Sequence, residues 1–376
     1  MTPDPAGAAP FHWTAEHEEF RAVVRKLTET RAPLACAPAP GSADPREREL
    51  WRTWTDELGL PGLVIPEEHG GAGFSRLELA IAATELGRAV AGGPLLASAV
   101  LATEALLAAG GDVAAEVLPA LATGTAVATL AVTEGTRRWQ EQDVTTAVED
   151  TGIPRLTGTK DAVLSAAEAT LLVVAAREEA GLSLFLAEPG DGVEVTPLEV
   201  LDGSRPMARV TLRGAPARRV GPPGQGWAAV ERALEAGTVF IAAEQVGGSR
   251  ALLDAAVEHA KTRVQFGQPI GRFQGVKHRL ADMAARTELA SAAAAWAAWQ
   301  PPGSDAAGLG AAVAGAYCSE AYLETALDAI QVHGGMAITW EHHAHRFLRR
   351  ARADAAVLRT PREHRRQLES IIGTGI

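Results

Sequence analysis

Two short segments of this chain carry side chains suited to binding a phosphorylated ligand. Residues 263–274 interrupt an Ala-rich run with a Gly/Pro turn that contains two arginines, two phenylalanines and three glutamines, and residues 331–335 read Gln-Val-His-Gly-Gly. Arginine offers phosphate oxygens a planar, permanently charged fork, and glycine lets a backbone approach such a group without a Cβ in the way. Taken alone, the first segment is equally explained as a helix stop followed by a turn.

As a pair, the two segments resemble the flavin-binding elements of the acyl-CoA dehydrogenase family. The resemblance implies FAD as the cofactor. It also implies an oligomer, because in that family these segments hold the pyrophosphate and adenosine of a neighbouring subunit's FAD. It further implies that Val132 and Thr133 meet the pyrimidine edge of the flavin. The remaining cofactor-binding residues that it implies are Arg263, Phe266, Gln268, Phe273, Gln331, Gly334 and Gly335.

The carboxylate base of the family is missing from both positions where the family places it. Removal of the α-proton of an acyl thioester needs a base within hydrogen-bond reach. Alignment on the second segment brings Leu358 to one family position, and counting back from Arg263 brings Gly237 to the other. Neither side chain can take a proton. Glu235 and Asp354 are the possible substitutes, although Glu235 is offset by two residues and faces another side of its helix.

The resemblance also fails where the family covers its own flavin. Ala162 stands where the family has a Trp or Phe, Leu164 stands where it has a Thr, and residues 135–139 lack the serine that helps to hold pyrophosphates. The basic tail, residues 360–366, resembles the short actinobacterial subunits of heterotetrameric acyl-CoA dehydrogenases. The chain therefore keeps the half-site that serves a neighbour's FAD and loses the half-site for its own.

The sequence also indicates the elements that position these residues. Residues 1–123 are predicted to form an N-terminal helical domain, and Thr14 is expected to cap its first helix. Residues 124–225 contain short β-branched runs separated by turns, which predict a small antiparallel β domain. Residues 226–376 return to long Ala-rich helices typical of a four-helix bundle. This order, mostly α and of the α+β class, is the acyl-CoA dehydrogenase fold.

Composition excludes several other classes of protein. The formal charge of −11 and the lack of a basic block interleaved with aromatics argue against nucleic-acid binding. The apolar runs are too short to span a membrane, and no secretory signal is visible at the N-terminus. Two cysteines, Cys36 and Cys318, are interpreted as buried small residues of a cytoplasmic protein. The histidines His333, His342, His343 and His345 lack the spacing of a metal site, so no metal is expected.

We interpret the chain as a subunit of an FAD-dependent acyl-CoA dehydrogenase of lipid metabolism that desaturates a bulky or specialised acyl thioester. It is expected to lack its own catalytic Glu, to assemble as a dimer or tetramer with itself or a related subunit, and to pass electrons to a transfer partner. Three alternatives remain open: a homo-oligomer whose base is Glu235 or Asp354, a flavin monooxygenase on the same fold, and a flavin-free scaffold subunit.

Overall fold

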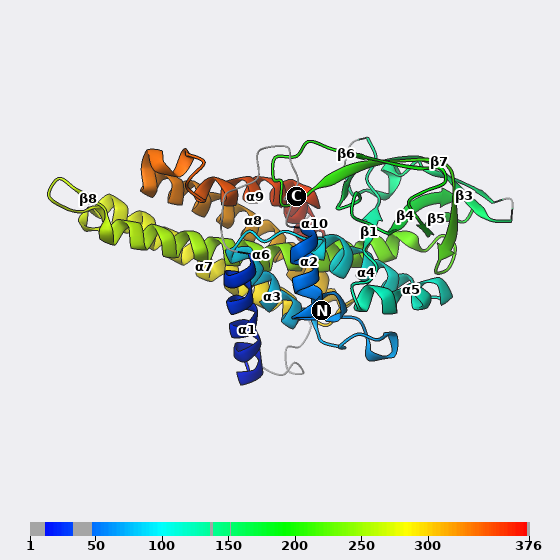
Figure 1. Ribbon diagram of the computed structural model, residues 1–376, viewed down its shortest axis with the longest axis horizontal. Coiled ribbons are helices and arrows are strands. Elements are labelled where there is room, and N and C mark those ends of the chain that lie inside the picture. Colours follow the sequence, from blue (N-terminus) through cyan, green and yellow to red (C-terminus); the bar gives the residue numbers. More distant parts are fainter. Residues whose placement is uncertain (1–11, 33–46, 136–137, 151, 374–376) are drawn as a thin grey trace.

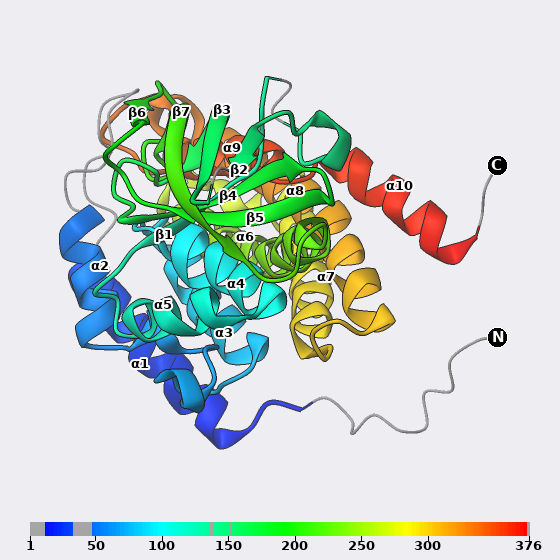
Figure 2. The same cartoon turned by 90° about the vertical axis from the view of Figure 1, so that its right-hand side faces the viewer.

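The computed structural model describes residues 12–32, 47–135, 138–150 and 152–373. A small domain of strands lies at one end of the long axis, and a bundle of long helices reaches to the other end (Figure 1). The shorter N-terminal helices pack along the bundle beneath the strands (Figure 2). Cys36, Thr136 and Arg137 lie outside the described residues. Within the described residues, no helix is both long and apolar enough to cross a membrane.

The N-terminal helices begin at capping residues that the sequence makes visible. Thr14 caps the first helix in a box with His17, as predicted, and Ser75 caps the third in a box with Glu78. The third helix packs closely on the first bundle helix, since a Cβ on Gly87 would lie 2.1 Å from a backbone oxygen of that helix. The helices are α1 (Ala15–Arg31), α2 (Glu47–Asp56), α3 (Arg76–Arg88), the π-helical η4 (Leu95–Ala102), α4 (Thr103–Ala109) and α5 (Asp112–Ala122).

The strands form a seven-stranded sheet whose pairings close into a ring in the order β4-β2-β3-β7-β5, with β1 and β6 attached. Most pairs are antiparallel, but β1 and β2 each run parallel to β4. The inner face of the ring is a separate apolar core that includes Phe185, Leu172 and Val210. The strands are β1 (Ala128–Ala131), β2 (Ala147–Asp150), β3 (Pro154–Leu164), β4 (Leu171–Glu178), β5 (Gly181–Ala187), β6 (Val193–Pro197) and β7 (Met207–Val220).

Long helices form the C-terminal part, and a two-stranded hairpin projects from its far end (Figure 1). Ala and Gly line the helix contacts, so the helices approach closely: a Cβ on Gly248 would lie 2.6 Å from the ring of Tyr322. The elements are α6 (Gly226–Thr262), β8 (Val264–Gln265), β9 (Gln268–Pro269), α7 (Gln274–Trp299), α8 (Asp305–His333), α9 (Ala344–Val357) and α10 (Pro361–Ile372). The domain boundaries predicted at 123/124 and 225/226 fall between elements, and we retain them as a proposal.

Candidate functional site

The hairpin after α6 presents the first of the two phosphate-binding segments to solvent. Arg263 ends α6, is exposed, and makes no ion pair within the described residues. Phe266 and Gly267 form the tight turn in left-handed backbone conformations, with φ of 53° and 75°. The Phe266 ring is 92 % exposed and meets the ring of Phe273 edge-on at 6.1 Å. An exposed aromatic ring can stack on the base of a nucleotide, and an unpaired arginine can neutralise its phosphate groups.

The second segment lies at the same end of the bundle. The rings of His259 on α6 and His333 on α8 stack at 4.6 Å, and this contact joins the ends of the two helices. His333 Nδ1 lies 2.7 Å from the carbonyl oxygen of Ala329, which fixes the ring one turn from the helix end. Gln331, Gly334 and Gly335 are exposed, and a Cβ on either glycine would meet open space. The structure thus brings together the two segments that the sequence singled out. Gln268 lies half-buried in the same hairpin.

Val132 and Thr133 lie far from this tip, in the β domain at the opposite end of the long axis (Figure 1). Both are buried, and the Thr133 hydroxyl donates to the carbonyl oxygen of Asp161. α6 is 37 residues long, about 55 Å of helix, and runs to the hairpin from the β domain, where a Cβ on Gly226 would touch Ser183 of β5. Val132 and Thr133 are therefore not part of the surface that the two segments form at the tip.

The FAD half-site at the bundle tip fits its expected ligand, and the half-site in the β domain fits poorly. At the tip, the unpaired guanidinium of Arg263 and the open glycines suit a pyrophosphate. In the β domain, the residue at the aromatic position is Ala162, in a bulge of β3 with a φ of 55°. Nearby, the indole of Trp139 donates to the carbonyl oxygen of Val357 at 3.1 Å, which ties the loop after β1 to the end of α9.

A buried ion pair supports the loop that follows β1. Lys160 Nζ lies 2.6 Å from Glu134 Oε1, and the hydroxyl groups and amides of Thr145 and Thr146 also donate to Glu134. Burial opposes the ionised form of Glu134, but Lys160 and these donors hold the pKa of Glu134 down at about 2. Burial lowers the pKa of Lys160 to about 8, against the pull of Glu134. This pair stabilises the loop and leaves no free base there.

The two positions for a catalytic carboxylate meet at one place in the structure. A Cβ added to Gly237 on α6 would lie 2.6 Å from Leu101 Cδ2 and 2.8 Å from Leu358 Cδ1. Leu101 is 1 % exposed and Leu358 is 6 % exposed. The adjoining cavity has a volume of only about 10 Å³, roughly the space of one water. Leucine side chains therefore fill the space next to Gly237.

The two substitute acids are held by arginines. Glu235 Oε1 accepts a hydrogen bond of 2.6 Å from Arg76 Nη1. The same guanidinium donates two hydrogen bonds to Glu104, of 2.9 and 3.0 Å. Asp354 Oδ1 accepts from Arg205 Nε at 2.8 Å. Two further acids of α6 are also paired, Glu231 with Arg359 and Glu244 with Arg205 and Arg350.

Asp354 belongs to a buried charge cluster between the β domain and the bundle. Arg350 donates to Asp202 at 2.6 Å and to Ser204 Oγ at 2.8 Å, while Arg205 bridges Asp354 and Glu244. Burial raises the pKa of Asp354 to about 6, against the pull of Arg205 and Arg350. The second carboxylate oxygen of Asp354 has no hydrogen-bond partner. Arg205 thus ties Asp354 on α9 to the loop before β7, and Asp354 also lines the small cavity beside Leu358.

The histidines stack and do not converge on an ion. The rings of His333 and His342 lie 4.6 Å apart, and His345 meets the ring of Trp340. Within the described residues, no group of three or more His, Cys, Asp or Glu side chains is arranged to hold a metal.

Sequence reasoning missed three residues that shape this site. Leu101 fills the base position from a helix far away in the sequence, Arg76 holds Glu235, and His259 joins the two cofactor segments. The only local signal was the spacing of His259 one helical turn before Arg263. The contacts of Leu101 and Arg76 are long-range, so no local pattern shows them.

Comparison with known proteins assigns the family. Residues 14–125 match the acyl-CoA dehydrogenase N-terminal domain, and residues 224–357 match the acyl-CoA dehydrogenase C-terminal domain. The chain is 34 % identical over 358 residues to acyl-CoA dehydrogenase IpdE2 of Mycobacterium tuberculosis, covering 94 % of this chain and 96 % of that protein. The chain therefore belongs to the acyl-CoA dehydrogenase family of flavin-dependent oxidoreductases.

Solved structures share the fold over nearly the whole length. The ChsE4-ChsE5 complex of Mycobacterium tuberculosis matches with a TM-score of 0.85 and 27 % identity, covering 98 % of this chain and 100 % of that one. A variant of the Tcur3481-Tcur3483 steroid ACAD matches with a TM-score of 0.83 and 27 % identity, covering 96 % and 98 %. These matches bear out the predicted fold of N-terminal helices, central strands and C-terminal helical bundle.

Proposed function

We propose that this chain is the base-free subunit of an FAD-dependent acyl-CoA dehydrogenase, and that a related partner subunit supplies the catalytic carboxylate. The observation that carries the proposal is the hydrocarbon contact of Gly237, Leu358 and Leu101. A carboxylate within reach of the substrate's α-carbon is needed to remove its proton. This chain has Gly237 and Leu358 at the two positions, with Leu101 packed against them, and pairs Glu235 with Arg76.

The chain's contribution to the cofactor is its bundle tip. Arg263 binds the pyrophosphate as a charged fork, Phe266 packs against the adenosine end, and the backbone at Gly334 and Gly335 leaves room for a close approach. Bound FAD supplies the acceptor for the hydride that leaves the acyl Cβ. The flavin ring itself binds to the partner subunit. This chain therefore has Ala162 at the position where the family has an aromatic residue that covers the ring.

The names of similar proteins support a heteromeric enzyme for a large acyl group. One solved relative is a complex of two differently named chains, and another is called a steroid ACAD. We propose a bulky acyl thioester as the substrate, a hetero-oligomer such as a tetramer as the active form, and an electron-transfer protein as the acceptor. The sequence-based expectations of a cytoplasmic location and of a role in lipid metabolism are kept as part of this proposal.

Flavin content tests the cofactor half-site. The assembled protein, co-expressed with an acyl-CoA dehydrogenase-like subunit that carries a Glu at the family position, is purified and its bound flavin measured by absorbance. Arg263→Ala removes a charge-assisted contact worth about 1.5–3 kcal/mol, so the affinity for FAD is expected to fall about 10- to 150-fold.

Lys261→Ala is the matched control, since Lys261 is an exposed cation two residues earlier whose ion-pair partner is Glu258. This variant is expected to retain flavin like the parent. Equal retention in the Arg263 and Lys261 variants would contradict the assignment of the half-site.

A further inference from the structure

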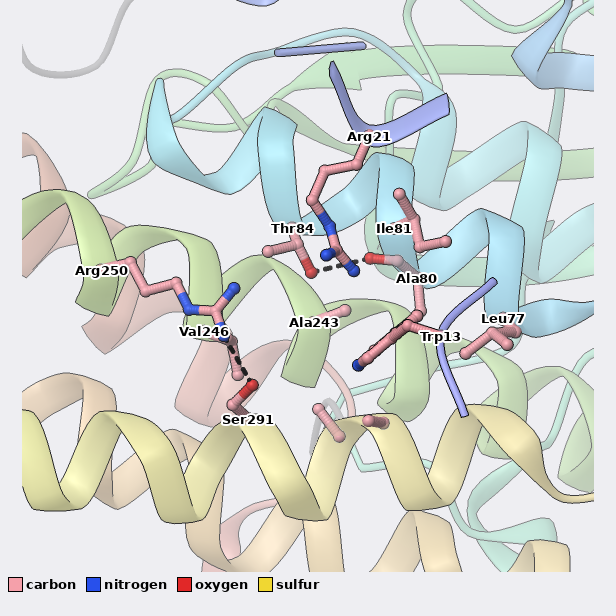
Figure 3. Close-up of a pocket in the computed structure, with 12 residues that line it drawn as sticks. Trp13, Arg21, Leu77, Ala80, Ile81, Thr84, Ala243, Val246, Arg250 and Ser291 are labelled. Atoms are coloured by element: carbon pink, nitrogen blue, oxygen red, sulfur yellow. Dashed lines mark hydrogen bonds between the residues drawn. The ribbon is translucent and has the colours of Figure 1, made fainter. Parts of the chain in front are cut away.

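A cavity of about 60 Å³ lies between α1, α3, α6 and α7, away from both cofactor segments (Figure 3). Two arginines point toward it from different helices, Arg21 from α1 and Arg250 from α6, and Trp13 lies at its edge. The rest of the wall is apolar apart from two hydroxyl groups. The lining residues are Trp13, Arg21, Leu77, Ala80, Ile81, Thr84, Ala243, Val246, Arg250, Ser291, Ala294 and Ala295.

Arg250 carries a charge that its surroundings do not neutralise. Its Nη2 donates to the neutral hydroxyl of Ser291 at 2.8 Å, and within the described residues it makes no ion pair. Burial lowers the pKa of Arg250, and Arg21 and Arg88 lower it further, while Glu288 and Glu85 pull the other way. A half-buried guanidinium without a carboxylate is unusual, because buried charges in proteins are generally paired.

Arg21 is only partly satisfied. Its Nη1 donates to the exposed Glu18 at 2.6 Å, its guanidinium lies 4.5 Å from the ring centroid of Trp13, and its Nε is buried without a hydrogen-bond partner. The lack of an acceptor costs free energy, because the carboxylate oxygen that faces this Nε, Glu85 Oε1, lies 4.0 Å away and beyond hydrogen-bond distance. An acceptor in the cavity would recover that free energy.

Glu85, a buried carboxylate near the cavity, is already paired with Arg25. Glu85 accepts two bonds from Arg25, at 2.8 and 3.0 Å, and its oxygens lie 4.0 Å from both Arg21 and Arg88. Arg88 has a second partner in the exposed Asp254. Glu85 is thus paired with Arg25, and Arg88 with Asp254, so neither carboxylate forms an ion pair with Arg250.

We propose that this cavity binds a short-chain monocarboxylate, such as acetate or propionate, between Arg21 and Arg250. Two planar guanidiniums match the two oxygens of a carboxylate, and Ser291 offers a further hydroxyl. The apolar wall, which includes Leu77, Ile81 and Val246, favours a ligand with a small alkyl part over an inorganic anion. At roughly 10–15 Å³ for one water-sized group, the cavity holds about four to six heavy atoms, which is the size of acetate or propionate.

The proposal is tested on the purified full-length protein by saturation-transfer NMR and calorimetric titration with propionate at constant ionic strength. Propionate is expected to bind and to compete with acetate, while neutral propionamide and inorganic phosphate bind at least about tenfold more weakly. Phosphate binding as tight as propionate would overturn the choice of ligand, and no binding of any anion would overturn the site.

Two variants localise the binding, and a third is the control. Arg250→Gln removes the unpaired charge. Ala295→Leu fills the cavity from α7 without changing the charge. If one of these variants does not fold, the other still tests the site. Each is expected to weaken propionate binding at least about tenfold. Arg88→Gln makes the same charge change outside the cavity lining and is expected to bind like the parent. Equal loss in the Arg88 and Arg250 variants would show that general electrostatics, and not this cavity, attracts the anion.

Discussion

Leu358 lies directly against Gly237, so that a Cβ added to Gly237 would be 2.8 Å from Leu358 Cδ1. These two residues are 121 positions apart (358 − 237) and are the two positions at which the sequence analysis expects the family's carboxylate. Leu101 closes the same space from η4. Because of this contact, the positions that were expected to carry a catalytic base belong to the apolar core.

This contact predicts a coupled pair in stability measurements. Gly237→Ala overpacks the core and is expected to lower the free energy of unfolding by about 1–3 kcal/mol, and Leu358→Ala is expected to lower it by about 2–5 kcal/mol through its cavity. In the double variant, the shortened Leu358 makes room for the new methyl group. The summed loss is then expected to exceed the measured loss by about 0.5–3 kcal/mol in denaturant titrations.

Gly308→Ala on α8 is the control, because a Cβ there meets nothing within 4 Å. It is expected to raise stability by about 0.4–1 kcal/mol. Strict additivity of the Gly237 and Leu358 variants would mean that the two residues do not touch.

The buried charge cluster predicts a pH dependence with a definite sign. Burial raises the folded-state pKa of Asp354 from 3.8 to about 6, so the folded protein binds this proton more tightly than the unfolded chain. The favourable contribution is complete below about pH 4 and is lost as the pH rises through 6. At pH 7.5 the ionised form costs up to about 3 kcal/mol. Asp354→Asn is therefore expected to be at least as stable as the parent at pH 7.5, with a flatter profile between pH 4 and 6.

Asp202, in the same cluster, is predicted to have the opposite pH dependence, and Asp202→Asn tests it. Although burial opposes it, Arg350 and Ser204 hold the pKa of Asp202 below its ordinary value, so its contribution is present above pH 4 and lost as the pH falls. Breaking its bond to Arg350 is expected to cost about 3–5 kcal/mol at pH 7.5. An Asp354→Asn variant as unstable as Asp202→Asn would refute the assigned role of Asp354.

Exposed apolar side chains at the far end of the bundle predict an oligomer. Ile338 is 73 % exposed and Trp340 is 52 % exposed in the segment that follows α8, and Phe266 is exposed in the hairpin. Trp296, near the other end of α7, is 39 % exposed. Light scattering at micromolar concentration is expected to give a dimer or larger species. Ile338→Asp is expected to weaken the assembly by placing a charge in an apolar interface.

Ile153→Asp serves as the control, since Ile153 is similarly exposed but lies in the β domain. It is expected to leave the assembly unchanged. A monomeric parent protein would contradict the shared-cofactor account as a whole.

The fold was largely predictable because each part of the chain has its own spacing of apolar residues and its own capping and turn residues. Ala-rich helical runs, β-branched runs and the cap at Thr14 are local signals, and the structure follows them. α10 was read only as a basic tail, although Thr360, Pro361 and Glu363 form a capping box with Pro at the first turn. The sequence does not mark β2 and β3 individually, because polar residues interrupt their alternation and a bulge shifts the register of β3.

The site was predictable only in part, for a physical reason. The composition of the tip segments was visible locally, but the partners of the acids were not. Glu235 pairs with Arg76, which is 159 positions away in the sequence. The convergence of Leu101 with Leu358, and the cluster of Arg205 with Asp354, depend on packing between segments distant in sequence.

The most direct test of the central claim is anaerobic titration of the isolated chain, reconstituted with FAD, against a broad panel of acyl-CoA thioesters. Flavin absorbance is followed with and without a Glu-bearing partner subunit. Because no carboxylate stands at Gly237 or Leu358, the chain alone is expected to leave the flavin oxidised, and bleaching is expected only when the partner is present. Rapid bleaching by the isolated chain, abolished by Glu235→Gln or Asp354→Asn, would contradict the account.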